Sequence, residues 1–173
     1  MQPTLLSSKE FCLDTSFIVR LFESFPRNIH VSLWEKIEEA IKGRCHIICE
    51  VEAELKSKFD EQYDWCMSQN IPVVQIEEDT FLEAKKIIAK YPTWIKPNTT
   101  DLYFADPFIV AHAKKNGCIV ITAEKAEEQA KVNKNPKIPD VCDFYGITCI
   151  AQRTGEIEIV PVNNFLKLLE IKH

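Results

Sequence analysis

The chain has 173 residues, a hydrophobic fraction of 46% and a net charge of −5. This length favours one domain over two, and we expect a single domain over 1–173, with its core at about 11–150 and a C-terminal hairpin and helix at about 151–173. No apolar run approaches the roughly 20 residues that span a bilayer, and the N-terminus lacks a signal-peptide pattern, which predicts a cytoplasmic protein with no membrane partner.

Apolar periodicity predicts strands that alternate with helices along the chain. The predicted strands lie at 11–14, 46–48, 72–76, 118–122 and 147–150. The predicted helices lie at 15–25, 32–41, 51–66, 80–91, 106–116, 138–145 and 162–171, with glycines 43 and 117 ending two of them. This alternation is typical of an α/β fold, and we expect a three-layer α/β/α sandwich with a mostly parallel central sheet of about five strands.

The seven cysteines do not form an evident disulfide or metal framework. Their number is odd, and most lie within apolar strand or helix patterns, so we interpret them as reduced thiols. Cys45 and Cys49 are spaced like half of a zinc site, but no second pair with ligand spacing follows. The four histidines show no ligand spacing either, and we expect His112 to pack on its helix.

The charge is unevenly distributed along the chain. Between Lys85 and Lys137 there are ten lysines and five acids, whereas the remainder has 11 basic and 21 acidic residues. A basic segment of this kind can contact a phosphate backbone even in an acidic protein, although solvated helix faces explain lysines equally well.

Acidic residues recur where predicted strands end and helices begin. Asp14 follows the first strand, Asp106 precedes the helix at 106–116, and Glu124 follows the strand at 118–122, after Thr122. The carboxyl ends of parallel strands share one edge of a sheet, which is where open α/β folds place their chemistry. Carboxylates gathered there suit a hard cation, Mg²⁺ or Mn²⁺, which supports phosphodiester hydrolysis.

Asp14 is the best candidate for the central ligand, and Thr15 and Ser16 could hydrogen-bond it or a metal-bound water. The second acid is open between Glu50 and Glu54, which share a helix face, whereas Glu52 points away.

The other acids have structural explanations too. Asp106 followed by Pro107 is also an ordinary helix start, with Asp as N-cap and Pro at the first helical position. Asp140 and Asp143 are better explained as surface or turn acids.

Four segments, taken in order, resemble the PIN-domain nuclease superfamily, most closely VapC-type toxins and an uncharacterised PIN-like branch. These segments are 13–16 (LDTS), 50–55 (EVEAEL), 105–113 (ADPFIVAHA) and 119–124 (IVITAE). The resemblance implies an α/β/α sandwich and a Mg²⁺- or Mn²⁺-dependent endoribonuclease. It also implies an antitoxin protein as a partner and, in many members, a homodimer.

The resemblance assigns Asp14, Glu54 and Asp106 as catalytic metal ligands. Glu124 stands where the family usually has Asp or Asn, and Asp140 is an alternative at this position. The sequence therefore predicts RNA hydrolysis at these acids. A catalytically inactive PIN-like binding or scaffold module is the alternative, and a phosphatase ranks lower because Ser16 stands where its second Asp would be.

Overall fold

The protein is an α/β sandwich around a five-stranded, all-parallel sheet with the order β3-β2-β1-β4-β5. The computed structural model describes residues 10–94, 104–127 and 136–171. The strands are β1 (Phe11–Leu13), β2 (Cys45–Ile48), β3 (Val73–Val74), β4 (Ile119–Lys125) and β5 (Cys149–Gln152). The helices are α1 (Thr15–Ser24), α2 (Val31–Ile41), α3 (Cys49–Lys58), α4 (Asp60–Ser68), α5 (Glu78–Lys90), α6 (Asp106–Asn116), α7 (Ile138–Tyr145) and α8 (Val160–Leu168). The predicted fold class and strand number are confirmed.

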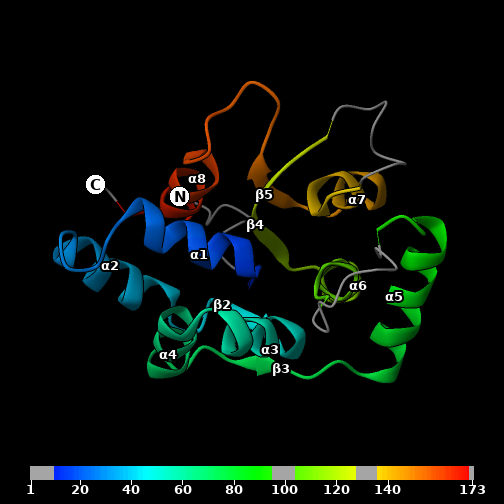
Figure 1. The fold of residues 1–173 in the computed structure, drawn as a ribbon, viewed down its shortest axis with the longest axis horizontal. Helices are drawn as coiled ribbons and strands as arrows, with labels where there is room; N and C mark the ends of the chain where they lie inside the picture. Colours follow the sequence, from blue (N-terminus) through cyan, green and yellow to red (C-terminus); the bar gives the residue numbers. More distant parts are fainter. Residues whose placement is uncertain (1–9, 95–103, 128–135, 172–173) are drawn as a thin grey trace, which may run out of the picture.

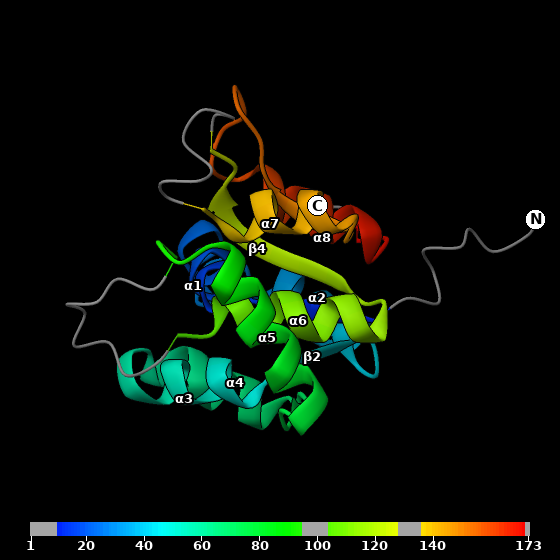
Figure 2. The ribbon, with the colours of Figure 1, turned by 90° about the vertical axis from the view of Figure 1, so that its right-hand side faces the viewer.

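Helices cover both faces of the sheet. On one face α1 and α8 pack on β4 and on each other, and on the other face α6 and α7 pack on β4, with α5 against α6 (Figure 1). Figure 2 views the molecule from the side of α5, α6 and α7. Side chains alternate between the faces along each strand: Phe11 stacks edge-on against Phe165 of α8 at 5.6 Å, whereas Cys12 points toward α6. The core therefore fills both layers between sheet and helices.

The order of the strands places a topological switch point between β1 and β4. From β1 the chain proceeds to β2 and β3 on one side, and it then crosses to β4 and β5 on the other side. Leu13 pairs with Ile121, and the Asp14 N–H donates to the Ile121 carbonyl at 2.9 Å. Open parallel sheets bind ligands outside the carboxyl ends of their strands at such a point. Asp14 and Glu124 both lie there.

The predicted helix over 51–66 is wrong, because the chain forms two helices that break at Phe59. Phe59 has φ −140° and ψ 66°, although its N–H still donates to the Leu55 carbonyl at 2.7 Å. The four-residue apolar spacing continues in the sequence to Tyr63, but Trp65 and Cys66 supply the buried face of α4. The break leaves Phe59 on the wall of a cleft rather than in a continuous helix stripe.

The C-terminal hairpin is also wrong. Residues 153–159 form turns in place of a second strand, and the last helix begins at Val160. The final strand lies two residues later than predicted, at Cys149–Gln152. Gly117 ends α6 with a φ of 69°, as predicted, because this left-handed conformation favours glycine. Within the described residues, no helix is both long and apolar enough to cross a membrane.

Candidate functional site

A cleft of about 410 Å³ opens at the carboxyl ends of β1 and β4 and is bordered by α1, α3 and α6. Four of the predicted ligands line it, each from a different segment of the chain: Asp14, Glu54, Asp106 and Glu124. The predicted convergence of distant acids at one sheet edge is therefore present.

Asp14 lies at the base of the cleft and is 4% exposed. It occupies the N-cap position of α1 with extended backbone angles, but its side chain does not cap the helix. Its Oδ2 atom instead accepts hydrogen bonds from the hydroxyls of Ser16, at 2.5 Å, and Thr122, at 2.8 Å. Two hydroxyls donate to Oδ2, and within the described residues no group donates to Oδ1.

The two hydroxyls connect the end of β4 to the start of α1. The hydroxyl oxygens of Ser16 and Thr122 lie 3.1 Å apart. The Ala123 N–H donates to Ser16 Oγ, and the Glu124 N–H donates to Thr122 Oγ1, both at 3.1 Å. Thr122 is fully buried. This network fixes the orientation of Asp14 relative to Glu124.

Glu54 is the acid of α3 that reaches the cleft. Its Oε2 accepts a hydrogen bond from Thr15 at 2.8 Å, so Thr15 contacts Glu54 and not Asp14. Lys58, one helical turn later, lies 3.7 Å from Oε1. Glu50 accepts a hydrogen bond from the Cys49 thiol, and neither Glu50 nor Glu52 lines the cleft.

Asp106 lies in the first turn of α6, where Ala105 and not Asp106 is the N-cap residue. The predicted capping role is therefore displaced by one residue, and Pro107 takes the second helical position. The Asp106 side chain lines the cleft. Within the described part of the chain its carboxylate has no hydrogen bond or ion pair, which is unusual for a half-buried acid.

Glu124 completes the set from β4. Its Oε2 accepts the Ile138 N–H at 2.8 Å, and the Lys137 ammonium lies 3.6 Å from Oε1.

Asp140, the alternative to Glu124, has a structural role. Its oxygens accept the N–H groups of Glu127 and Lys137, both at 3.0 Å, and it forms a capping box at the start of α7. It is not among the residues that line the cleft.

Burial and mutual repulsion disfavour the charged forms of these acids. Burial raises the pKa of Asp14 to about 6, and the charges of Glu124 and Glu54 act in the same direction against the hydrogen bonds of Ser16 and Thr122. Burial, followed by the charges of Glu124, Asp14 and Glu54, raises the pKa of Asp106 well above its usual range. Burial also raises the pKa of Glu124, against the opposing effects of the Ile138 N–H and Lys137.

The protein's own cations neutralise only part of this charge. Lys58 and Lys137 face Glu54 and Glu124, whereas in the described ranges Asp14 and Asp106 have no lysine or arginine within ion-pair distance. Carboxylates that repel one another in a partly buried cleft suit a divalent cation, and oxygen donors of this type suit Mg²⁺ or Mn²⁺.

The basic segment contributes less positive charge than its composition indicates. Lys114 forms an ion pair with Glu83, and Lys115 forms one with Asp79, both on α5.

Arg20 of α1 lines the cleft, which periodicity alone did not predict, and it pairs with Glu158 at 2.8 Å. Its signal in the sequence is its position four residues after Ser16, which puts both on one face of the helix.

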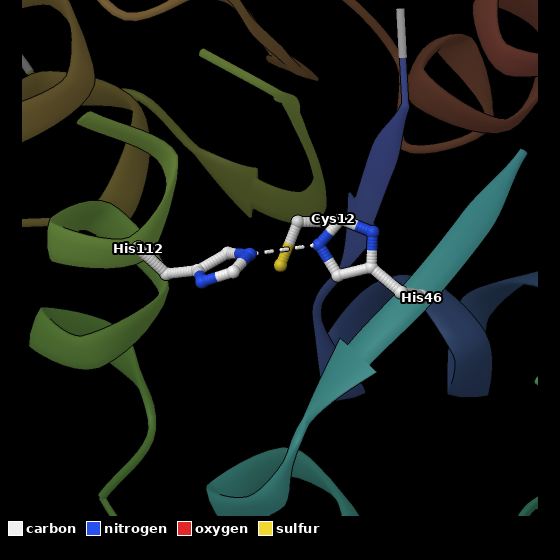
Figure 3. Close-up of side chains that lie close together, drawn as sticks. All are labelled: Cys12, His46 and His112. Atoms are coloured by element: carbon white, nitrogen blue, oxygen red, sulfur yellow. Dashed lines mark hydrogen bonds between the residues drawn. The ribbon is translucent and has the colours of Figure 1, made fainter. Parts of the chain in front are cut away.

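A second group of ligand-type side chains lies toward the amino ends of β1 and β4, away from the cleft. Cys12, His46 and His112, all buried, direct a sulfur and two ring nitrogens at one another (Figure 3). The sequence contained no spacing signal for this group, because its members come from β1, β2 and α6. Finding it requires the strand register, in which Cys12 lies opposite His46.

Comparison with known proteins gives a family. A family model described as a domain of unknown function, DUF4411, matches residues 11–154. The chain belongs to this family. The match runs from β1 to just beyond β5, so the DUF4411 domain contains the whole sheet, all four cleft acids and the Cys–His group. No curated protein matches the chain.

Proposed function

We propose that this protein is a Mg²⁺- or Mn²⁺-dependent endoribonuclease of the PIN type, with Asp14, Glu54, Asp106 and Glu124 as its metal-binding and catalytic acids. One observation carries the proposal: acids from four separate segments line one cleft at the switch point of a parallel sheet. The resemblance of the four motifs to PIN nucleases supports the same assignment.

The donor atoms fit such an ion. The cleft offers carboxylate oxygens and hydroxyls, with no nitrogen or sulfur ligand among its described lining residues. Asp14 Oδ1 and the Asp106 carboxylate lack protein partners among the described residues, and they are the oxygens we assign to the cation. Mg²⁺ or Mn²⁺ held there would supply Lewis-acid polarisation of a phosphodiester and activation of a water nucleophile.

The side chains around the acids have distinct roles in this proposal. Ser16 and Thr122 orient Asp14, and Thr15 orients Glu54. Lys58 and Lys137 lie beside Glu54 and Glu124, and Arg20 lies on the cleft wall. A polyanionic backbone entering the cleft would attract these cations, which can exchange carboxylate partners for phosphates.

The test is cleavage of single-stranded and structured RNA by the purified protein in Mn²⁺. Asp14→Asn and Glu54→Gln should abolish cleavage, as should EDTA. Glu52→Gln is the matched control, because Glu52 is on the same helix as Glu54 but does not line the cleft. Cleavage that persists in Asp14→Asn with EDTA present would refute the proposal.

The second candidate is a PIN-like binding or scaffold module without catalysis. The lysines beside Glu54 and Glu124 favour it, because they partly occupy the acids that a cation would need. Mn²⁺ binding that depends on Asp14 separates the two candidates, since a scaffold needs none. The antitoxin partner and the homodimer stay predictions of the family resemblance.

A further inference from the structure

The buried face of the sheet under α6 gathers four side chains that bind soft metal ions. Cys12 Sγ and one ring nitrogen each of His46 and His112 lie within 4.8 Å of one another. Cys118, directly before β4, lines the same cavity as His46 and His112. Cys12, His46 and Cys118 come from neighbouring strands, and His112 comes from the helix above them.

The strand register explains why these residues meet. Cys12 lies opposite His46 in β2 and opposite Val120 in β4. Cys118 precedes Val120 by two residues and therefore projects to the same face as Cys12. α6 covers this face, and its His112 points toward Cys12 and His46 (Figure 3).

The rings are oriented for a shared ligand. His46 Nε2 and His112 Nε2 face each other at 2.9 Å. Two nitrogens that bind one tetrahedral zinc ion are about 3.4 Å apart, so the rings need to separate by only a few tenths of an ångström. The other ring nitrogens have polar neighbours: Glu10 lies 3.6 Å from His46 Nδ1, and Asn116 Nδ2 lies 3.1 Å from His112 Nδ1. A carboxylate such as that of Glu10 can accept the proton of the outer ring nitrogen and so orient a metal-binding histidine, whereas the Asn116 amide nitrogen is a donor and does not do so for His112.

A zinc ion would add no net charge to this buried position. Cys12, His46 and His112 are at most 6% exposed, and Cys118 is also 6% exposed. Two thiolates and two neutral imidazoles around Zn²⁺ carry no net charge, which suits a buried position. Zinc binding would release the two thiol protons, and the proton shared by the rings would move to the outer nitrogen of one imidazole, which stays neutral.

The site also has an access route. A cavity of about 490 Å³ is lined by His46, His112 and Cys118, with Glu10 and Asn116 at its border. An ion can therefore approach His46, His112 and Cys118 from this cavity, with Cys12 buried behind them.

We infer that Cys12, His46, His112 and Cys118 form a structural zinc site that clamps β1, β2, β4 and α6 together. The elements it joins also carry Asp14, Asp106 and Glu124. Zinc would therefore fix the relative positions of the segments that bear these acids. The site is distinct from the cleft in ligand type, and the inference does not depend on nuclease activity.

The experiment measures metal content and the absorption spectrum, and neither requires catalysis. Protein reconstituted with Zn²⁺ and passed through a desalting column should retain one equivalent of zinc. Cys12→Ser and His112→Asn should reduce retention at least tenfold. Replacing zinc by Co²⁺ in the wild-type protein should give thiolate-to-cobalt charge-transfer absorption and the intense visible bands of a tetrahedral ion.

Cys45→Ser is the matched control, because Cys45 is equally buried, precedes His46 directly and projects to the opposite face of β2. It should keep its zinc, as should Asp14→Asn. The Co²⁺ spectrum is recorded on wild-type protein, so a variant that fails to fold leaves the test intact. Wild-type protein that retains no zinc and shows no thiolate–cobalt band, or a Cys45→Ser variant that loses zinc as fully as Cys12→Ser, would overturn the inference.

Discussion

Two groups of ligand-type side chains share one layer of this protein, and they differ in chemistry and in position. The cleft group consists of carboxylates at the carboxyl ends of β1 and β4, where solvent and a large substrate can enter. The Cys–His group lies two residues earlier along β1, under α6, and is buried. Hard oxygen ligands at an open edge suit an exchangeable Mg²⁺ or Mn²⁺ ion, whereas soft ligands in the core suit a permanent one.

The same strands and the same helix carry both groups, at different positions along their lengths. Cys12 and Asp14 are two residues apart on the chain, and His112 and Asp106 are six apart on α6. The rise of an α-helix puts about 9 Å between the latter pair. The inner group would then fix the strands and helix on which the outer group depends, and each group can be removed separately by experiment.

The largest expected effect is on catalysis. Asp14→Asn should lower the rate of RNA cleavage in Mn²⁺ by a factor on the order of 100 or more, because loss of one charged ligand weakens a Lewis-acid effect worth several kcal/mol. Initial rates on a labelled RNA measure this effect. Asp143→Asn is the control, since Asp143 pairs with Arg153 at 2.6 Å on an exposed face. Equal losses in both variants would contradict a special role for the cleft.

Next in size is the effect of the inner group on stability. Cys12→Ser in zinc-loaded protein should lower the free energy of unfolding by several kcal/mol, because the free energy of metal binding contributes to folding. Cys45→Ser should cost far less. Denaturant unfolding with and without a zinc-selective chelator distinguishes the two. If chelation leaves the unfolding midpoint of the wild-type protein unchanged, the inner group is not a metal clamp.

A third effect links the cleft acids to pH. Burial raises the folded-state pKa of Asp14 to about 6, above its ordinary value of 3.8. In this window the folded state binds a proton that the unfolded state has lost, so the contribution of Asp14 to stability falls as pH rises from about 4 to about 6. Asp14→Asn should therefore be more stable than wild type by up to about 3 kcal/mol at pH 7 without added Mg²⁺ or Mn²⁺.

The gain in stability of Asp14→Asn should shrink toward zero near pH 4. Unfolding curves of both proteins between pH 4 and pH 7 measure the difference, and other titrating groups cancel between them. A difference of the opposite sign at pH 7 would show that the Asp14 carboxylate is stabilised rather than strained.

The smallest effect concerns the hydroxyl that orients Asp14. Thr122→Val removes the 2.8 Å bond to Asp14 and the acceptor of the Glu124 N–H, each worth about 1 kcal/mol. Cleavage should fall about tenfold, with Mn²⁺ affinity reduced by less. Thr122→Ser keeps the hydroxyl and should retain most activity. Equal loss in both variants would indicate a packing effect of the methyl group.

Much of this fold was predictable from the periodicity of apolar residues, because apolar spacing marks the strands and helices and glycines mark the ends of helices. The division of the segment 51–66 into two helices was not predictable. The apolar spacing of Val51, Leu55 and Phe59 continues through the segment, whereas the break depends on the backbone angles of Phe59. The prediction of a hairpin in the C-terminal tail was wrong for a similar reason. The alternating residues around Gly155 are also compatible with turns, and residues 153–159 do not pair with another strand.

The outer site was more predictable than the inner one. Asp14, Asp106 and Glu124 stand at element boundaries, which a sequence reveals directly. The choice of Glu54 over Glu50 needed the position of Thr15, and the structural role of Asp140 needed the geometry of the start of α7. Cys12, His46 and His112 meet only through strand pairing and helix packing, so their spacing along the chain carries no signal.

The most direct test of the account is a calorimetric titration of Mn²⁺ into zinc-loaded wild-type protein and into its Asp14→Asn variant at pH 7. We predict saturable binding to the wild-type protein that is lost in Asp14→Asn and retained in Glu52→Gln. Identical Mn²⁺ binding by the wild-type protein and Asp14→Asn, or none by either, would contradict the claim that these acids form a cation site.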